Sequence, residues 1–282
     1  EACASFESQL SENYPNEPMG IKYKQFLNDI GSINAPIALL KNTPKTIFKS
    51  KWISFIGKFI FPIITLFLGL GASLLPEKYK SESFTEYFSI IAISWFWFMG
   101  ASYLTQFPNL ARDYLGGSAQ VVTLLLTLFS LGVALGSLVC ERLSGYKIEL
   151  GIVPLGSIGM TLFGIDLYFS ISTIQVVENM SAINFIQQPG NWRLMFDIAM
   201  VSAFGGLFVV PLQALIQHRS ETKNRSQIIA ANNVFNAIFM VASAAIGILV
   251  LVVLELTIPE YFLVLAVMNI IVTVYITIIK HP

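Results

Sequence analysis

Residues 119–140 read AQVVTLLLTLFSLGVALGSLVC, a run without a single charged side chain. A helix needs about 20 mostly apolar residues to cross the hydrocarbon core of a bilayer, and this run is long enough. Its apolar residues are continuous, whereas the strands of a membrane barrel alternate apolar and polar positions. The stretch therefore predicts a membrane-spanning α-helix.

Similar apolar runs recur along the rest of the chain, and short segments rich in charges and turn formers separate them. Pro154 and Pro211 lie inside such runs without arguing against helices, because neighbouring helices re-satisfy the freed backbone groups. We expect an all-α fold, a polytopic transmembrane bundle of six helices preceded by one further hydrophobic helix. The runs lie at 52–75, 88–107, 119–140, 150–170, 193–216, 227–252 and 259–279.

The composition of the 282 residues agrees with a membrane protein. Hydrophobic side chains make up 55% and charged ones only 12%, against roughly 25% charged in ordinary globular chains. The 17 basic and 17 acidic residues cancel, so no bulk field attracts a polyanion. These values argue against a disordered chain, a nucleic-acid-binding protein and an ordinary soluble enzyme.

The sequence divides into three parts. Residues 1–51 carry 11 of the 34 charges and are expected to form a polar segment or loop against the membrane. Residues 52–87 are expected to hold a single hydrophobic helix and a linker, and residues 88–282 the six-helix bundle. The first residue is Glu rather than Met, which leads us to expect a missing N-terminal portion.

The Lys and Arg residues of the short loops predict the orientation, because they are enriched on the cytoplasmic side. With the C-terminus inside, eight such residues lie inside and only Arg112 and Arg193 lie outside. The run at 52–75 breaks this pattern, because it would leave the lysines before it outside. The bias therefore applies to the last six helices.

A loop motif connects this layout to a known family. The chain reads Gly136-Ser-Leu-Val-Cys-Glu141-Arg142-Leu-Ser-Gly145-Tyr-Lys147, which resembles the G-x-x-x-D-R-x-G-R-K loop of the major facilitator superfamily, with Glu in place of Asp and one residue inserted before the Gly. Transporters of that superfamily have two related halves of six helices. The resemblance implies that the chain is the C-terminal half of such a transporter, with the N-terminal half as its missing partner.

Further segments resemble the lysophospholipid-transporter branch of that superfamily. Proteins of this branch move lyso-phosphatidylethanolamine or related lysolipids across the bacterial inner membrane. The resemblance implies a multi-pass inner-membrane transporter that works by alternating access, with membrane lipid and a lysophospholipid as partners and a proton or sodium ion as coupling ion. The segments are Ile93-Ser-Trp-Phe-Trp-Phe98, Tyr103-Leu-Thr-Gln-Phe-Pro108, Val122-Thr-Leu-Leu-Leu-Thr-Leu-Phe129, Cys140-Glu-Arg-Leu-Ser-Gly145 and Ile228-Ile-Ala-Ala-Asn-Asn-Val-Phe-Asn236.

The resemblance also implies a gating role for the loop residues Glu141, Arg142, Gly145 and Lys147. Such a loop would pair with a neighbouring helix end in one conformation and release it in another. The alternative is that these charges only set the topology of the chain.

Asp166 is the first candidate for substrate binding, because a carboxylate in hydrocarbon is costly and marks a pathway or proton site by default. The alternatives are a position near the interface or a hydrogen bond to a neighbouring helix. Asp197 follows Arg193 by four residues, so we expect these two to pair on one helix face. Arg112 and Asp113 are expected to pair locally.

Two groups of uncharged polar residues complete the predicted substrate site. Asn232, Asn233 and Asn236 either join helices, at about 1 kcal/mol or less each, or donate amide hydrogen bonds to a glycerophosphate head group. Thr105 and Gln106 are expected to face a central cavity.

No enzymatic site is predicted. The two histidines, His218 and His281, lack an aspartate four or five residues further on, and no serine–histidine–acid set or metal cluster is assembled. We therefore expect no catalytic residues, metal or cofactor. Two alternatives stay open: export of another amphipathic or small solute, and a truncated membrane remnant that transports nothing.

Overall fold

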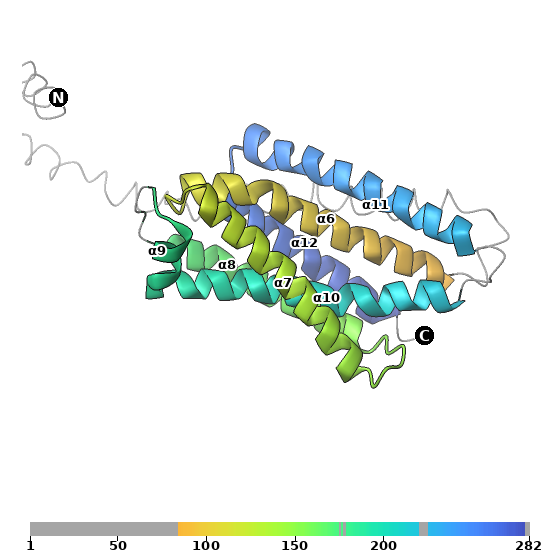
Figure 1. Cartoon of the computed structure of the whole chain (residues 1–282). Coiled ribbons are helices and arrows are strands. Elements are labelled where there is room, and N and C mark those ends of the chain that lie inside the picture. The colour runs from red at the N-terminus through yellow and green to blue at the C-terminus, as the bar shows by residue number, and fades with distance from the viewer. Residues whose placement is uncertain (1–83, 175, 177–178, 220–224, 280–282) are drawn as a thin grey trace, which may run out of the picture. The chain divides into compact units, whose positions relative to one another are not determined.

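The predicted apolar runs fold as helices in the computed structural model, which describes residues 84–174, 176, 179–219 and 225–279. These residues form no strand, and all of them belong to one unit, Leu68–Pro282. The polar segment 1–51 and the run 52–75 lie outside the described residues. The elements, shown in Figure 1, are α6 (Phe84–Asp113), α7 (Ala119–Leu143), α8 (Ile152–Ser172), α9 (Ala182–Gln187), η3 (Pro189–Asn191), α10 (Trp192–Arg219), α11 (Arg225–Ile248), η4 (Leu249–Val253) and α12 (Ile258–Ile279).

Five of these helical segments are long and apolar enough to cross a membrane. The predicted all-α bundle is thereby confirmed, and the chain is a multi-pass membrane protein by length and composition. The last run, 259–279, forms α12, whose apolar stretch Ile258–Val274 is shorter. The five segments are Phe88–Asp113, Ala119–Leu143, Ile152–Ser172, Pro189–Arg219 and Arg225–Val253.

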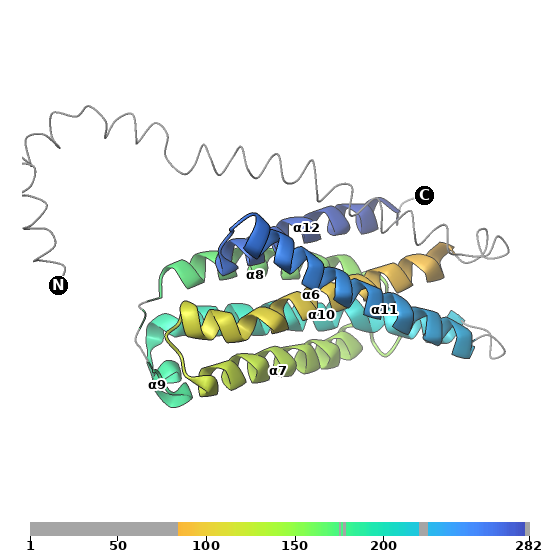
Figure 2. The same ribbon diagram turned by 90° about the horizontal axis from the view of Figure 1, so that it is seen from above.

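Helix α10 lies at the centre of the bundle and packs against α6, α7 and α8. Helix α11 packs on α6 and α12 packs on α8, so these two helices lie further out (Figure 2). We call the end at which α6 ends and α7 begins the outer end, following the orientation that the loop charges predict.

Glycines allow α7 and α10 to approach closely. The buried residues of α7 follow one another at intervals of three or four, which places them on one helix face. A Cβ added at Gly136 would overlap the backbone carbonyl of Ala203, and one at Gly206 would lie 2.6 Å from the carbonyl oxygen of Val133. Backbone contact of this kind is how small residues join membrane helices.

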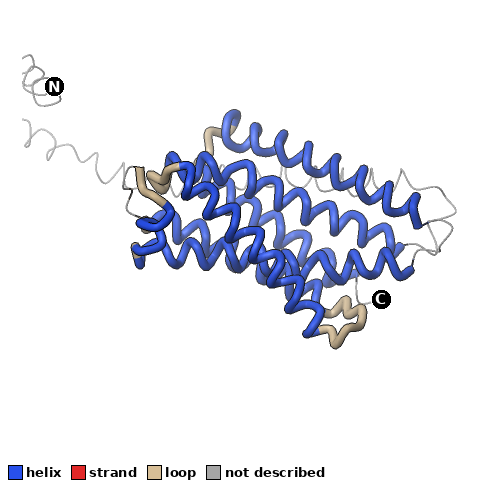
Figure 3. The backbone as a smooth tube through the Cα atoms, in the orientation of Figure 1, coloured by secondary structure: helices blue, strands red, loops and turns tan. Residues whose placement is uncertain are grey.

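The connection between α8 and α10, one of the short segments that separate the apolar runs, contains α9 and η3, and Figure 3 shows that it is partly helical. The hydroxyl of Ser181 caps α9 by accepting a hydrogen bond from the backbone N–H of Asn184 at 3.3 Å. Met180 exchanges backbone hydrogen bonds with Gly116 and Ser118. A helix of six residues has too few positions to show a periodic pattern, so the sequence did not predict it.

Candidate functional site

An ion pair joins α8 to α10 at the outer end. The guanidinium of Arg193 donates two hydrogen bonds to the carboxylate of Asp166, one of them from Nε to Oδ2 at 3.1 Å. The side chains are 50% and 39% exposed, respectively. Asp166 is therefore the partner of a cation on the neighbouring helix.

The expected pair of Arg193 with Asp197 is wrong. Asp197 is only 1% exposed and faces into the bundle from the second turn of α10, whereas the Arg193 side chain extends outward and across to α8. The spacing of four residues is right for a pair on one helix, but a cross-helix carboxylate takes both hydrogen bonds.

Asp197 is left without a hydrogen bond on either carboxylate oxygen within the described part of the chain. Its neighbours are Ser170 and Asp166 on α8 and Arg193 on its own helix. The hydroxyl of Ser170 itself donates to the backbone carbonyl of Leu167. Asp197 is thus a buried carboxyl group beneath an exposed ion pair.

A second polar cluster, which the sequence did not predict, joins α6, α8 and α12. Asn269 accepts a 2.8 Å hydrogen bond from the indole N–H of Trp95. Its amide group donates to Thr161 at 2.9 Å and to the backbone carbonyl of Ser157 at 2.8 Å. The available signal was a lone amide in an apolar run, which needs partners on neighbouring helices.

The asparagines of α11 do not act as one group. Asn232 and Asn236 are each 7% exposed, while Asn233 is exposed. Asn236 accepts a 2.9 Å hydrogen bond from Ser94 of α6, so it joins two helices as one of the two predicted roles requires. The carbonyl oxygen of Asn232 is buried without a hydrogen bond to any described residue.

Thr105 and Gln106 lie apart from these asparagines. The hydroxyl of Thr105 donates to the backbone of its own helix, and Gln106 accepts a hydrogen bond from the amide of Asn109. Thr105 is eleven positions beyond Ser94, the partner of Asn236, hence about 16 Å further along α6. The predicted substrate residues therefore fall into separate groups at different depths.

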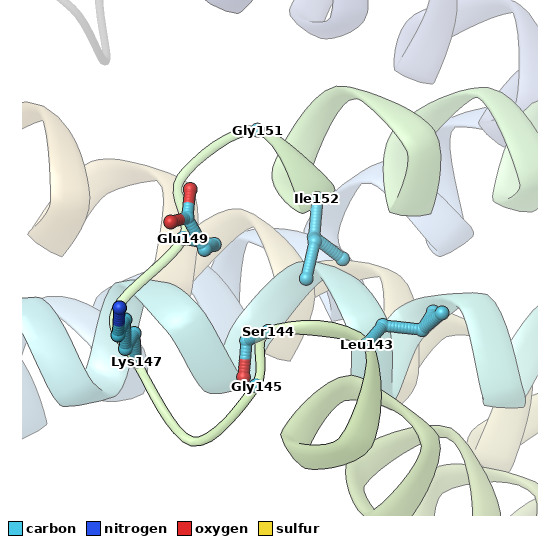
Figure 4. A pocket seen from close by; sticks show the side chains of 7 residues that line it. All are labelled: Leu143, Ser144, Gly145, Lys147, Glu149, Gly151 and Ile152. Carbon is cyan, nitrogen blue, oxygen red and sulfur yellow. The ribbon is translucent and has the colours of Figure 1, made fainter.

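Two of the four predicted gating residues, Gly145 and Lys147, line an open pocket of about 470 Å³ at the inner end of α7 and α8, whereas Glu141 and Arg142 do not line it. Figure 4 shows Lys147 and Glu149 on the connecting loop, with Leu143 and Ser144 at the end of α7 and Ile152 at the start of α8.

The backbone turns sharply in this loop. Gly145 and Tyr146 have φ angles of 57° and 61°, a left-handed conformation that favours glycine. The side chains of Glu141, Arg142 and Lys147 are exposed. They are therefore free to meet another part of the protein.

Within the described residues, no group of three or more His, Cys, Asp or Glu side chains is placed to hold a metal ion. Comparison with known proteins gives no further guide to the site, because no family model, curated protein or solved structure matches this chain.

Proposed function

We propose that this chain is the second half of a major facilitator transporter in a bacterial inner membrane and that it moves lysophospholipid by alternating access. In such transporters the substrate site lies between two bundles that rock against each other. The cavity would form between this bundle and a first half, with the loop of Glu141, Arg142, Gly145 and Lys147 as its inner gate.

The observation that carries this proposal is the uneven burial of the helices. In α6 and α10, 67% and 61% of the apolar stretch is buried inside the bundle, against 28% and 33% in α7 and α11. Two of the five long apolar helices therefore present most of their surface outward. Such faces suit a second bundle and a shared cavity.

The outward face of α7 changes character along its length. Thr123, Thr127 and Ser130 are exposed at its outer half, spaced by four and three residues, whereas Leu131 and Leu135 are exposed further in. The three hydroxyl groups donate to backbone carbonyls of their own helix and keep free lone pairs. A wall with hydroxyls at one end and leucines at the other suits a molecule with a polar head and an acyl chain.

The test is uptake of a fluorescent lysophosphatidylethanolamine by vesicles that contain the whole protein encoded by the gene. We expect uptake above that of empty vesicles and competition by unlabelled lysolipid, but not by an amphipathic drug. Competition by the drug alone would favour export of another solute. No uptake of either kind would contradict the transport proposal.

A matched pair of variants tests the wall of the cavity. Thr127→Leu removes a hydroxyl from the exposed face of α7, and Ser137→Ala removes one from a half-buried position on the same helix. We expect the first to reduce uptake and the second to leave it unchanged. Equal uptake by both variants would argue against this face as the substrate path.

A further inference from the structure

We propose that Asp197 is the site at which the bundle takes up one monovalent cation, a proton or a sodium ion, between α8 and α10. The binding step is independent of transport, while its use as a coupling site rests on the function proposed above.

The charges of Asp166, Arg193 and Asp197, at the outer end of α8 and α10, do not balance. Arg193 and Asp166 neutralise each other through two hydrogen bonds. Asp197, beside them, adds one negative charge to the group. The three side chains together are therefore short of one positive charge.

The burial of Asp197 makes this imbalance costly. The side chain is 1% exposed, and neither carboxylate oxygen has a hydrogen bond from a described residue. An ionised carboxylate without partners in an apolar interior costs several kcal/mol or more. A bound cation removes that cost.

The neighbouring helices offer no other compensation in their described parts. The charges of α6 at this end, Arg112 and Asp113, pair with each other. The charges of α7, Glu141 and Arg142, lie at its opposite end, and Glu260 of α12 bonds to Thr257. No second cation reaches Asp197 from these elements.

The same geometry limits the charge of the ion. A divalent cation such as Ca²⁺ takes six to eight oxygen ligands, and the described residues hold no group of three acidic, His or Cys side chains. One unpaired carboxylate balances one positive charge.

Thermal unfolding of the whole protein in detergent tests this inference, since a ligand of the folded state raises the melting temperature with its concentration. If the ion is sodium, a tenfold rise in free Na⁺ at fixed pH raises the melting temperature by roughly 3–5 °C, with choline as the control salt. If the ion is a proton, the melting temperature falls as the pH rises and is indifferent to Na⁺.

Two variants identify the residue. Asp197→Asn should lose this dependence, while Asp113→Asn, which changes an exposed aspartate beside an arginine at the same end, should keep it. Equal dependence in the wild type and both variants would overturn the proposal. If the Asp197→Asn protein does not fold, two measurements on the wild type decide the matter. One is the binding of ²²Na⁺, and the other is the number of protons that the protein binds, followed with a pH indicator. If neither detects a bound cation, the proposal is overturned.

The result is separable from the transport proposal. Cation dependence that requires Asp197 without lysolipid uptake would leave the site standing and remove its coupling role. Lysolipid uptake without cation dependence of the melting temperature would support the transport proposal and overturn the cation site.

Discussion

The indole N–H of Trp95 donates a 2.8 Å hydrogen bond to the side-chain carbonyl of Asn269, and this bond joins α6 to α12. Asn269 is 0% exposed, and its amide group also binds α8. One side chain therefore connects three helices in the apolar interior. Since polar bonds of this kind average about 0.6 kcal/mol each in membranes and reach about 1.7, the group is a modest but concentrated source of stability.

We predict that Asn269→Ala lowers the free energy of unfolding by about 1–3 kcal/mol, because it removes these bonds and leaves the indole N–H of Trp95 without its acceptor. Chemical unfolding in mixed micelles measures the change. Asn233→Ala is the matched control, because Asn233 is exposed on α11. Equal stability of the two variants would show that the cluster does not hold the helices together.

We also predict that Gly136→Ala destabilises the bundle by about 1–3 kcal/mol, because the added methyl group overlaps the backbone of Ala203 and forces α7 away from α10. Gly100→Ala should instead stabilise by about 0.5–1 kcal/mol, since nothing lies within 4 Å of its Cβ position in the middle of α6. Both values come from the same unfolding assay. A neutral Gly136→Ala would contradict the close approach of the two helices.

The helices themselves were predictable from the sequence, because length and hydropathy are local properties. The run 119–140 became α7 (Ala119–Leu143), and the run 227–252 became α11 followed by a π-helical turn, η4. The local pair of Arg112 and Asp113 was also predicted correctly. Each of these features depends on residues close together in the chain.

The cross-helix partners were not predictable in this way. Arg193 has one carboxylate four residues away along the chain and another 27 residues away. It binds the distant one, Asp166, because the packing of α8 against α10 brings the two side chains together. Asn269 is a single amide in an apolar run, and its partners on α6 and α8 are more than a hundred residues distant. Side-chain direction around each helix, which sequence spacing gives only approximately, determines such contacts.

A third prediction compares two arginines at the outer end. Arg193→Gln should lower the melting temperature more than Arg112→Gln, because it leaves Asp166 and the buried Asp197 together without a cation. Arg112 contacts only its exposed neighbour Asp113, and exposed pairs contribute little. The melting temperatures of both variants in one detergent decide the matter. A larger drop for Arg112→Gln would show that the Asp166–Arg193 pair is not structural.

A fourth prediction separates gating from stability in the loop after α7. Because Arg142 and Lys147 are exposed, Arg142→Gln and Lys147→Gln should leave the melting temperature nearly unchanged while reducing lysolipid uptake. Glu255→Gln, an exposed change in another loop, is the control for both readouts. Uptake that stays normal in both loop variants would assign these charges to topology alone.

The most direct test of the transport account is the initial rate of fluorescent lysophosphatidylethanolamine uptake into vesicles that contain the whole encoded protein, measured beside empty vesicles. The account predicts a saturable rate above that of empty vesicles, reduced by Thr127→Leu and by Arg142→Gln. A rate equal to that of empty vesicles, with protein that is folded by its melting transition, would contradict it.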